Sequence, residues 1–230
     1  MRKFANCWWT KRRVIKSLKD CIPVAKKLCE NAKYRLFKFI RLPMRVVSSV
    51  FEFYPHLQIV HLLRDPRGVM MSQIRVKKFE VDKLPERSRE HCTSVAGDLK
   101  YTNKLHKTYP HRIKILLYEN LAENPIRTAT RMYQFAGMPA YDYILKYVSE
   151  ITQKGRKGGQ GRDDFGVRKV NSTRTAYSWR DGIEFGNVEV IDSNCHSIYD
   201  FLGYQSFYTA ADVANHDLPT LLTPDSSLII

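Results

Sequence analysis

The chain has 230 residues, of which 43% are hydrophobic and 12% aromatic, enough apolar material for one globular domain. This composition excludes a largely disordered chain, and the lack of any run of about 18 apolar residues excludes a transmembrane bundle. Lys and Arg number 38 against 23 Asp and Glu, a net charge of +15, so we expect an anionic partner such as a nucleotide, nucleic acid, an acidic lipid surface or an acidic polysaccharide.

Hydrophobic periodicity and helix-breaking residues predict alternating strands and helices along most of the chain. In chain order we predict a basic amphipathic helix over 10–33 interrupted near Pro23, a strand over 36–42, a helix over 43–53, a strand over 57–63, helices over 66–76 and 86–108, a strand over 113–118, and helices over 125–137 and 183–203. The alternation predicts an α/β fold with a parallel sheet.

The turn after the apolar run 57–63 contains the most specific candidate binding motif of the sequence. In an open parallel sheet, ligands bind beyond the carboxyl ends of the strands, where Arg64 is expected. An Arg fork, with the Ser72 hydroxyl in the following helix, suits a phosphate, because the guanidinium donates two parallel hydrogen bonds and the helix dipole favours an anion. The alternative is a surface ion pair between Arg64 and Asp65, with Ser72 an ordinary helix residue.

Two further features leave alternatives open. The Gly-rich basic loop 154–162 is either an anion-binding backbone loop or a disordered connection. The five cysteines are either reduced thiols or form one or two disulfides in a secretory lumen, and Cys92–Cys195 and Cys21–Cys29 are both conceivable pairs. No Cys and His spacing indicates a zinc site, so we expect no metal.

Four ordered segments resemble the carbohydrate sulfotransferases, in particular those that sulfate galactose, N-acetylglucosamine or N-acetylgalactosamine, typically at the 6-hydroxyl. The segments are KFIRLPM, LLRDPRGVMMSQ, LLYENLAENPIRTATRMYQFAGMP, and NSTRTAYSWRDGIEF with the IDSNC and FLGY that follow it. The resemblance implies a P-loop-like sulfotransferase fold, 3′-phosphoadenylyl sulfate as donor, and a glycosaminoglycan or glycoprotein glycan as acceptor. It also implies a type II membrane protein of the Golgi lumen, although this sequence contains no targeting or transmembrane segment.

The resemblance assigns residues to the nucleotide. Arg64 and Ser72 match the Arg and Ser that bind its 3′-phosphate. Arg67 and Gly68 lie in the same segment, where backbone amides and extra positive charge would help. Arg174 matches the Arg of the closing segment, which would face the nucleotide.

Two residue pairs of the resemblance suggest supporting roles. Tyr118 and Glu119 match a Tyr-Glu pair that we interpret as mainly structural: Glu119 either orients neighbouring donors or is an ordinary structural residue. Trp179 and Arg180 match a Trp-Arg pair, and we interpret Trp179 as a core anchor.

The 5′-phosphosulfate loop of the family, of the type R-x-G-S-[ST], has no counterpart, since residues 1–35 contain no glycine. We therefore expect an N-terminally incomplete fold with three parts: a basic helical segment (1–35), the C-terminal portion of a sulfotransferase domain (36–207) and a loosely packed tail (208–230). Either the sequence is a truncated enzyme or it is a short protein without catalysis. No residue stands out as the catalytic base. The alternative function is a non-catalytic basic module that binds nucleotide, acidic polysaccharide or nucleic acid, but no nucleic-acid-binding motif is present.

Overall fold

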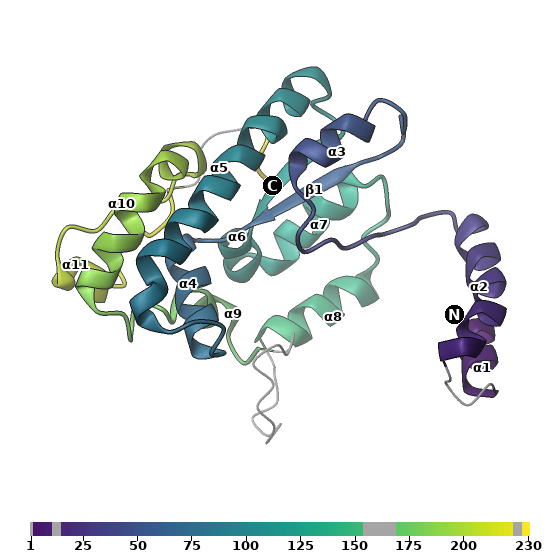
Figure 1. Cartoon of the computed structure of the whole chain (residues 1–230), viewed down its shortest axis with the longest axis horizontal. Helices are drawn as coiled ribbons and strands as arrows, with labels where there is room; N and C mark the ends of the chain where they lie inside the picture. Colours follow the sequence, from purple (N-terminus) through teal and green to yellow (C-terminus); the bar gives the residue numbers. More distant parts are fainter. Residues whose placement is uncertain (1, 11–14, 154–168, 223–226) are drawn as a thin grey trace. The chain divides into compact units, whose positions relative to one another are not determined.

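A computed structural model describes residues 2–10, 15–153, 169–222 and 227–230, and Figure 1 labels their helices and strands. The Gly-rich loop 154–162 lies outside the described residues. The chain divides into two units, residues 1–42 and residues 43–230, so the boundary falls after the predicted 35/36.

The first unit contains two helices, α1 (Arg2–Thr10) and α2 (Ile15–Glu30). A disulfide between Cys7 and Cys21 joins them, with 5.7 Å between the two Cα atoms. The pairing Cys21–Cys29 is therefore wrong, and Cys29 is an exposed free thiol. Pro23 lies inside α2, which continues past it for another two turns, so this proline does not interrupt the helix.

The predicted strand over 36–42 is not formed. Leu36 is 95% exposed and Ile40 is 83% exposed, and the segment has no regular structure. Alternating apolar and basic residues suit a strand with one buried face, but a strand also needs a neighbour that accepts its backbone hydrogen bonds. Within the described residues this segment has no such neighbour, because the sheet contains only strands from the second unit.

The second unit is built on a short parallel sheet of β1 (Ile59–Leu63) and β2 (Ile113–Leu117), in register from Ile59 opposite Ile113 to Leu63 opposite Leu117. The C-terminus adds a bridge on the other side of β2. The Ile115 amide donates to the Leu228 carbonyl at 2.8 Å, and the Ile230 amide donates to the Ile115 carbonyl at 2.9 Å. The end of the segment 208–230, expected to pack loosely, is thus held by the sheet.

Helices surround the sheet, and several begin or end where the sequence predicts it. Pro66 and Pro125 occupy first turns, where the missing amide costs nothing, and Gly203 ends a helix with φ 86°. The α/β class with a parallel sheet is confirmed. The helices are α3 (Met44–Val50), α4 (Pro66–Arg75), the 3₁₀ turn η1 (Val81–Lys83), α5 (Leu84–Thr108), α6 (Tyr118–Glu123), α7 (Pro125–Phe135), α8 (Asp142–Gln153), α9 (Ser172–Tyr177), α10 (Phe185–Leu202) and α11 (Ala210–Ala214).

The core of this unit lies between the sheet, α4, α5 and α10. Helices α5 and α10 lie side by side and are joined by the buried disulfide Cys92–Cys195, which confirms this pairing (Figure 1). Apolar side chains from all these elements meet there, among them Leu63, Met70, Leu99, Leu117, Ile191 and Ile198.

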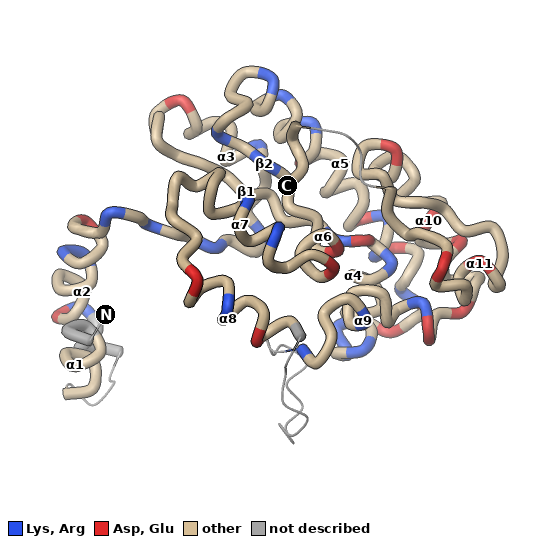
Figure 2. Tube along the Cα trace, turned by 180° about the vertical axis from the view of Figure 1, so that it is seen from behind, with Lys and Arg blue, Asp and Glu red and all other residues tan. Residues whose placement is uncertain are grey.

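The charge of the second unit is segregated along the chain. Figure 2 shows acidic residues on α10 and α11, and residues 181–230 contain no Lys or Arg. The excess of positive charge therefore belongs to the chain that precedes these helices. Among the described helices, none is long and apolar enough to cross a bilayer.

Candidate functional site: the corner between β1 and α4

Residues 64–68 form a tight corner between β1 and α4, which we call the corner. Asp65 caps α4, because its carboxylate accepts a hydrogen bond from the Arg67 amide at 2.9 Å. Pro66 takes the first helical position. The corner therefore places the positive end of the α4 dipole directly beyond the carboxyl end of a parallel strand, a common position for an anion.

Arg64 lies at the end of β1, and its side chain is half-buried. Its guanidinium carbon is 4.6 Å from the centroid of the Tyr118 ring, which supports the side chain from one side. Its Nε is buried and has no hydrogen-bond partner among the described residues. Arg64 is thus a positioned cation with unused donor capacity.

Gly68 makes the close approach of Arg64 to α4 feasible. A Cβ at this position would lie 3.1 Å from the Arg64 Nε and 3.2 Å from the Trp179 Cδ1. A larger residue would push Arg64 away from the first turn of the helix. Ser72 follows Gly68 one turn later on the same face of α4 and is half-buried. Arg64 thus packs against α4 at Gly68, and Ser72 lies one turn further along the same face of this helix.

Arg67 points in a different direction from Arg64. Its side chain is completely buried, and its Nε and Nη2 donate to the two carboxylate oxygens of Asp65, both at 3.0 Å. Its Nη1 donates to the Gln205 carbonyl at 2.9 Å. The rings of Trp179, Tyr199 and Phe207 surround its guanidinium at 4.8 to 5.1 Å. The extra positive charge expected of Arg67 is therefore paired with the Asp65 carboxylate inside the protein.

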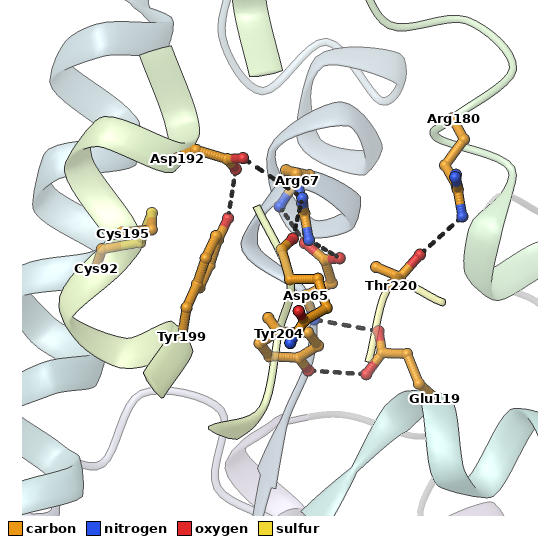
Figure 3. A network of polar contacts seen from close by, with 11 residues as sticks. Asp65, Arg67, Cys92, Glu119, Arg180, Asp192, Cys195, Tyr199, Tyr204 and Thr220 are labelled. Carbon is orange, nitrogen blue, oxygen red and sulfur yellow. Dashed lines mark hydrogen bonds and ion pairs between the residues drawn. A yellow bond between two sulfur atoms is a disulfide. The ribbon is translucent and has the colours of Figure 1, made fainter. Parts of the chain in front are cut away.

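A second carboxylate faces Arg67 from α10. The Asp192 Oδ2 lies 3.5 Å from the Arg67 Nη1, and the Asp192 Oδ1 accepts from the Tyr199 hydroxyl at 2.7 Å (Figure 3). Burial raises the pKa of Asp192, although Arg67 acts against this, and burial also raises the pKa of Tyr199. For Arg67, burial lowers the pKa, but Asp65, Tyr199 and Asp192 together raise it by more, so the group stays charged.

Glu119 connects the corner to the start of α6. One of its oxygens accepts from the Asp65 amide at 3.1 Å and the other from the Tyr204 hydroxyl at 2.9 Å (Figure 3). Its side chain is buried, and burial followed by the nearby charge of Asp65 raises its pKa from 4.5 to about 7. Glu119 therefore orients two donors, the Asp65 amide and the Tyr204 hydroxyl, one of the two roles that the Tyr-Glu pair left open.

Arg174 lies elsewhere, on α9, where its backbone amide donates to the side chain of Asn171 at 2.8 Å. It lines a pocket of about 540 Å³ together with Glu123, Asn171, Thr173, Tyr177, Asp181 and His216. Within this pocket the Tyr177 hydroxyl donates to Glu123, and His216 pairs with Asp181 at 2.8 Å. Its lining therefore carries both signs of charge. Across the described residues no group of three or more His, Cys, Asp or Glu could hold a metal ion.

The predicted Trp-Arg pair has a structural role. Trp179 is 2% exposed and packs with Phe207, which confirms it as a core anchor. Arg180 is also buried and donates to four carbonyls and one hydroxyl of the segment that follows α10. These acceptors are the carbonyls of Asp212, Val213, Asn215 and Leu218 and the hydroxyl of Thr220. Arg180 thus fixes the path of residues 212–220.

Helix α10 and the following turn supply partners to the corner that the sequence motifs did not predict. Asp192 and Tyr199 are seven residues apart and so share one face of a helix, a signal that was available in the sequence. Tyr204 and the Gln205 carbonyl, by contrast, reach the corner only through the fold of the chain after Gly203.

Comparison with known proteins places the chain in a family. The model of the sulfotransferase family matches residues 4–142, more than half of the chain, so the chain belongs to the sulfotransferase family. The family resemblance drawn from the four sequence segments is confirmed. No solved structure matches the chain.

Curated relatives are carbohydrate sulfotransferases. Carbohydrate sulfotransferase 4 of Mus musculus is 23% identical over 222 residues, covering 86% of this chain and 55% of the relative. Carbohydrate sulfotransferase 3 of Tetronarce californica is 25% identical over 226 residues, covering 89% and 50%. Carbohydrate sulfotransferase 6 of Homo sapiens is 26% identical over 227 residues, covering 86% and 55%. The chain spans about half the length of the curated relatives it matches.

Proposed function

We propose that this chain carries the 3′-phosphate-binding part of a carbohydrate sulfotransferase. The reaction is transfer of a sulfuryl group from 3′-phosphoadenylyl sulfate to a glycan hydroxyl, with the 6-position of a hexose or N-acetylhexosamine as the proposed target. The family membership and the names of the relatives support this reaction class.

The observation that carries the proposal is the state of Arg64. This cation lies beyond a parallel strand, at the positive end of α4, and its Nε is buried without a hydrogen-bond partner among the described residues. A buried, unpaired donor of a charged group is costly, so such groups normally have partners. A phosphate bound at the corner would accept from Arg64 and from the Ser72 hydroxyl, in the field of the α4 dipole.

The other predicted nucleotide contacts take different parts in this proposal. Gly68 provides the space for Arg64, and the buried Arg67 binds Asp65 and supports the corner without contacting the nucleotide. Arg174 remains a proposed contact to another part of the nucleotide, because its side chain is exposed on a pocket wall.

We propose a secretory compartment, the Golgi lumen, for the protein. Two disulfides, Cys7–Cys21 and Cys92–Cys195, support an oxidising environment. The proposed acceptor is a glycosaminoglycan or a glycoprotein glycan, which such a compartment supplies.

Calorimetric titration of the full chain with adenosine 3′,5′-bisphosphate tests the nucleotide site. We expect binding by the wild type and a loss of at least about tenfold in Arg64→Ala and in the double variant Arg64→Ala, Ser72→Ala, because a hydrogen bond to a charged group contributes about 1.5–3 kcal/mol. Arg75→Ala is the matched control, since Arg75 is an exposed Arg at the far end of the same helix.

Two outcomes would contradict the proposal. If the double variant binds as tightly as the wild type, the site lies elsewhere. If the wild type binds a sulfated polysaccharide but not the nucleotide, the chain is a basic binding module, the function that its net charge of +15 would serve.

A further inference from the structure

We infer that Glu119, Asp65 and Arg67 form a buried clamp that positions Arg64 for the nucleotide phosphate, so that Glu119 and Arg67 control ligand affinity without touching the ligand. The inference rests on the proposed nucleotide site. It assigns a positioning role to two residues, one of which the sequence pattern placed among the phosphate contacts.

Glu119 holds the peptide bond that follows Arg64. The amide of Asp65 belongs to this peptide, and Glu119 accepts its hydrogen bond at 3.1 Å. Because a peptide unit is planar, holding this amide fixes the ψ rotation of Arg64. The direction in which the Arg64 side chain leaves the end of β1 is therefore set by a side chain from α6.

Asp65 and Arg67 hold the other end of the corner together. The Asp65 carboxylate accepts from the Arg67 amide at 2.9 Å and from the Arg67 guanidinium at 3.0 Å, so one carboxylate both caps α4 and binds a buried Arg. Arg67 then reaches the Gln205 carbonyl and Asp192, which belong to α10 and the turn after it. The first turn of α4 is thus tied to a part of the chain more than 120 residues away.

Every polar side-chain atom of Glu119 and Arg67 already has a partner inside the protein. Both Glu119 oxygens are used, by the Asp65 amide and the Tyr204 hydroxyl, and Glu119 is 0% exposed. Arg67 is also 0% exposed, with aromatic rings around its guanidinium. Any effect of these two residues on ligand binding must therefore pass through the geometry of the corner.

The experiment compares two substitutions of Glu119 by titration with adenosine 3′,5′-bisphosphate. Glu119→Gln keeps an oxygen that accepts from the Asp65 amide, and we expect its affinity to stay within about twofold of the wild type. Glu119→Ala leaves that amide without its partner, and we expect a loss of about tenfold. Thermal unfolding of each variant, followed by circular dichroism, reports stability separately.

Asp98→Ala is the matched control. The Asp98 carboxylate also accepts from a backbone amide of another element, that of Met44 at 2.8 Å, but far along the chain from the corner. Its loss should lower stability and leave the affinity for adenosine 3′,5′-bisphosphate unchanged. A purely structural role for Glu119 would make the two Ala variants behave alike.

The results separate the inference from the proposed function. If the wild type does not bind adenosine 3′,5′-bisphosphate, the proposed site and the clamp both fall. If the wild type binds and Glu119→Ala binds equally well, or if Glu119→Gln is as weak as Glu119→Ala, the clamp alone is refuted. Should Glu119→Ala fail to fold, Tyr204→Phe decides, because it removes only the second hydrogen bond of Glu119. We then expect a two- to fivefold loss, on the order of one neutral hydrogen bond, and unchanged affinity would refute the clamp.

Discussion

Replacing Glu119 by Gln should make the protein more stable at neutral pH, and the gain should disappear in acid. Glu119 is wholly buried, and burial together with the charge of Asp65 raises its pKa from 4.5 to about 7. The folded protein therefore holds a proton on Glu119 between about pH 4.5 and pH 7, where the unfolded chain has released it. Stability contributed by this group is present at low pH and is lost as the pH rises through 7.

The magnitude follows from the size of the shift. A difference between 4.5 and about 7, at 1.36 kcal/mol per unit, corresponds to about 3 kcal/mol that the ionised form costs above pH 7. Gln carries no charge at any pH, so it avoids this cost. We expect the free energy of unfolding of Glu119→Gln, minus that of the wild type, to increase by up to about 3 kcal/mol between pH 5 and pH 8.

Urea denaturation at pH 5, 6, 7 and 8 measures this difference, and taking it between two chains cancels the titration of all other groups. Tyr204→Phe provides an internal check. The Tyr204 hydroxyl donates to Glu119 and so lowers the pKa of that carboxyl, and its removal should extend the loss of stability to higher pH. A difference between Glu119→Gln and wild type that stays flat with pH, or that falls as the pH rises, would refute the reasoning.

Three further predictions concern backbone and covalent constraints. Gly68→Ala should weaken binding of adenosine 3′,5′-bisphosphate, measured by calorimetry, because its Cβ would lie 3.1 Å from the Arg64 Nε; unchanged affinity would show that the contact is relieved without moving Arg64. Gly97→Ala, in the middle of a helix with no atom within 4 Å of the added Cβ, should instead raise the free energy of unfolding by about 0.5–1 kcal/mol in urea denaturation, and a decrease would contradict this. Replacing Cys92 and Cys195 together by Ser should lower stability by about 2–5 kcal/mol, and an equal melting temperature with and without reductant in the wild type would indicate that the bond does not form.

Arg64 and Arg67 have different side-chain environments because of long-range packing. Both belong to the same RDPR tetrapeptide, and charge alone gives no reason to distinguish them. The structure distinguishes them because Asp192, Tyr199 and the Gln205 carbonyl converge on Arg67 from α10 and the turn beyond it. Arg64 instead rests on the Tyr118 ring and keeps a donor unused among the described residues.

Local sequence patterns determined those parts of the fold that depend on neighbouring residues. The apolar runs 57–63 and 113–118 became β1 and β2, Pro66 and Pro125 started helices, and the order of motifs indicated the family. These features follow from periodicity and from the backbone restrictions of proline, which act within a few residues.

Tertiary structure alone decided whatever requires a partner from elsewhere in the chain. The segment 36–42 has a strand-like pattern but lacks a strand to pair with, whereas the end of the chain, with no clear pattern, bonds to Ile115 in the sheet. Likewise, the net charge of +15 indicates an anionic ligand, but it does not show which cation is free to meet one. Burial distinguishes Arg64 from Arg67, because the Arg67 guanidinium is enclosed by carboxylates and rings, whereas the Arg64 Nε has no hydrogen-bond partner among the described residues.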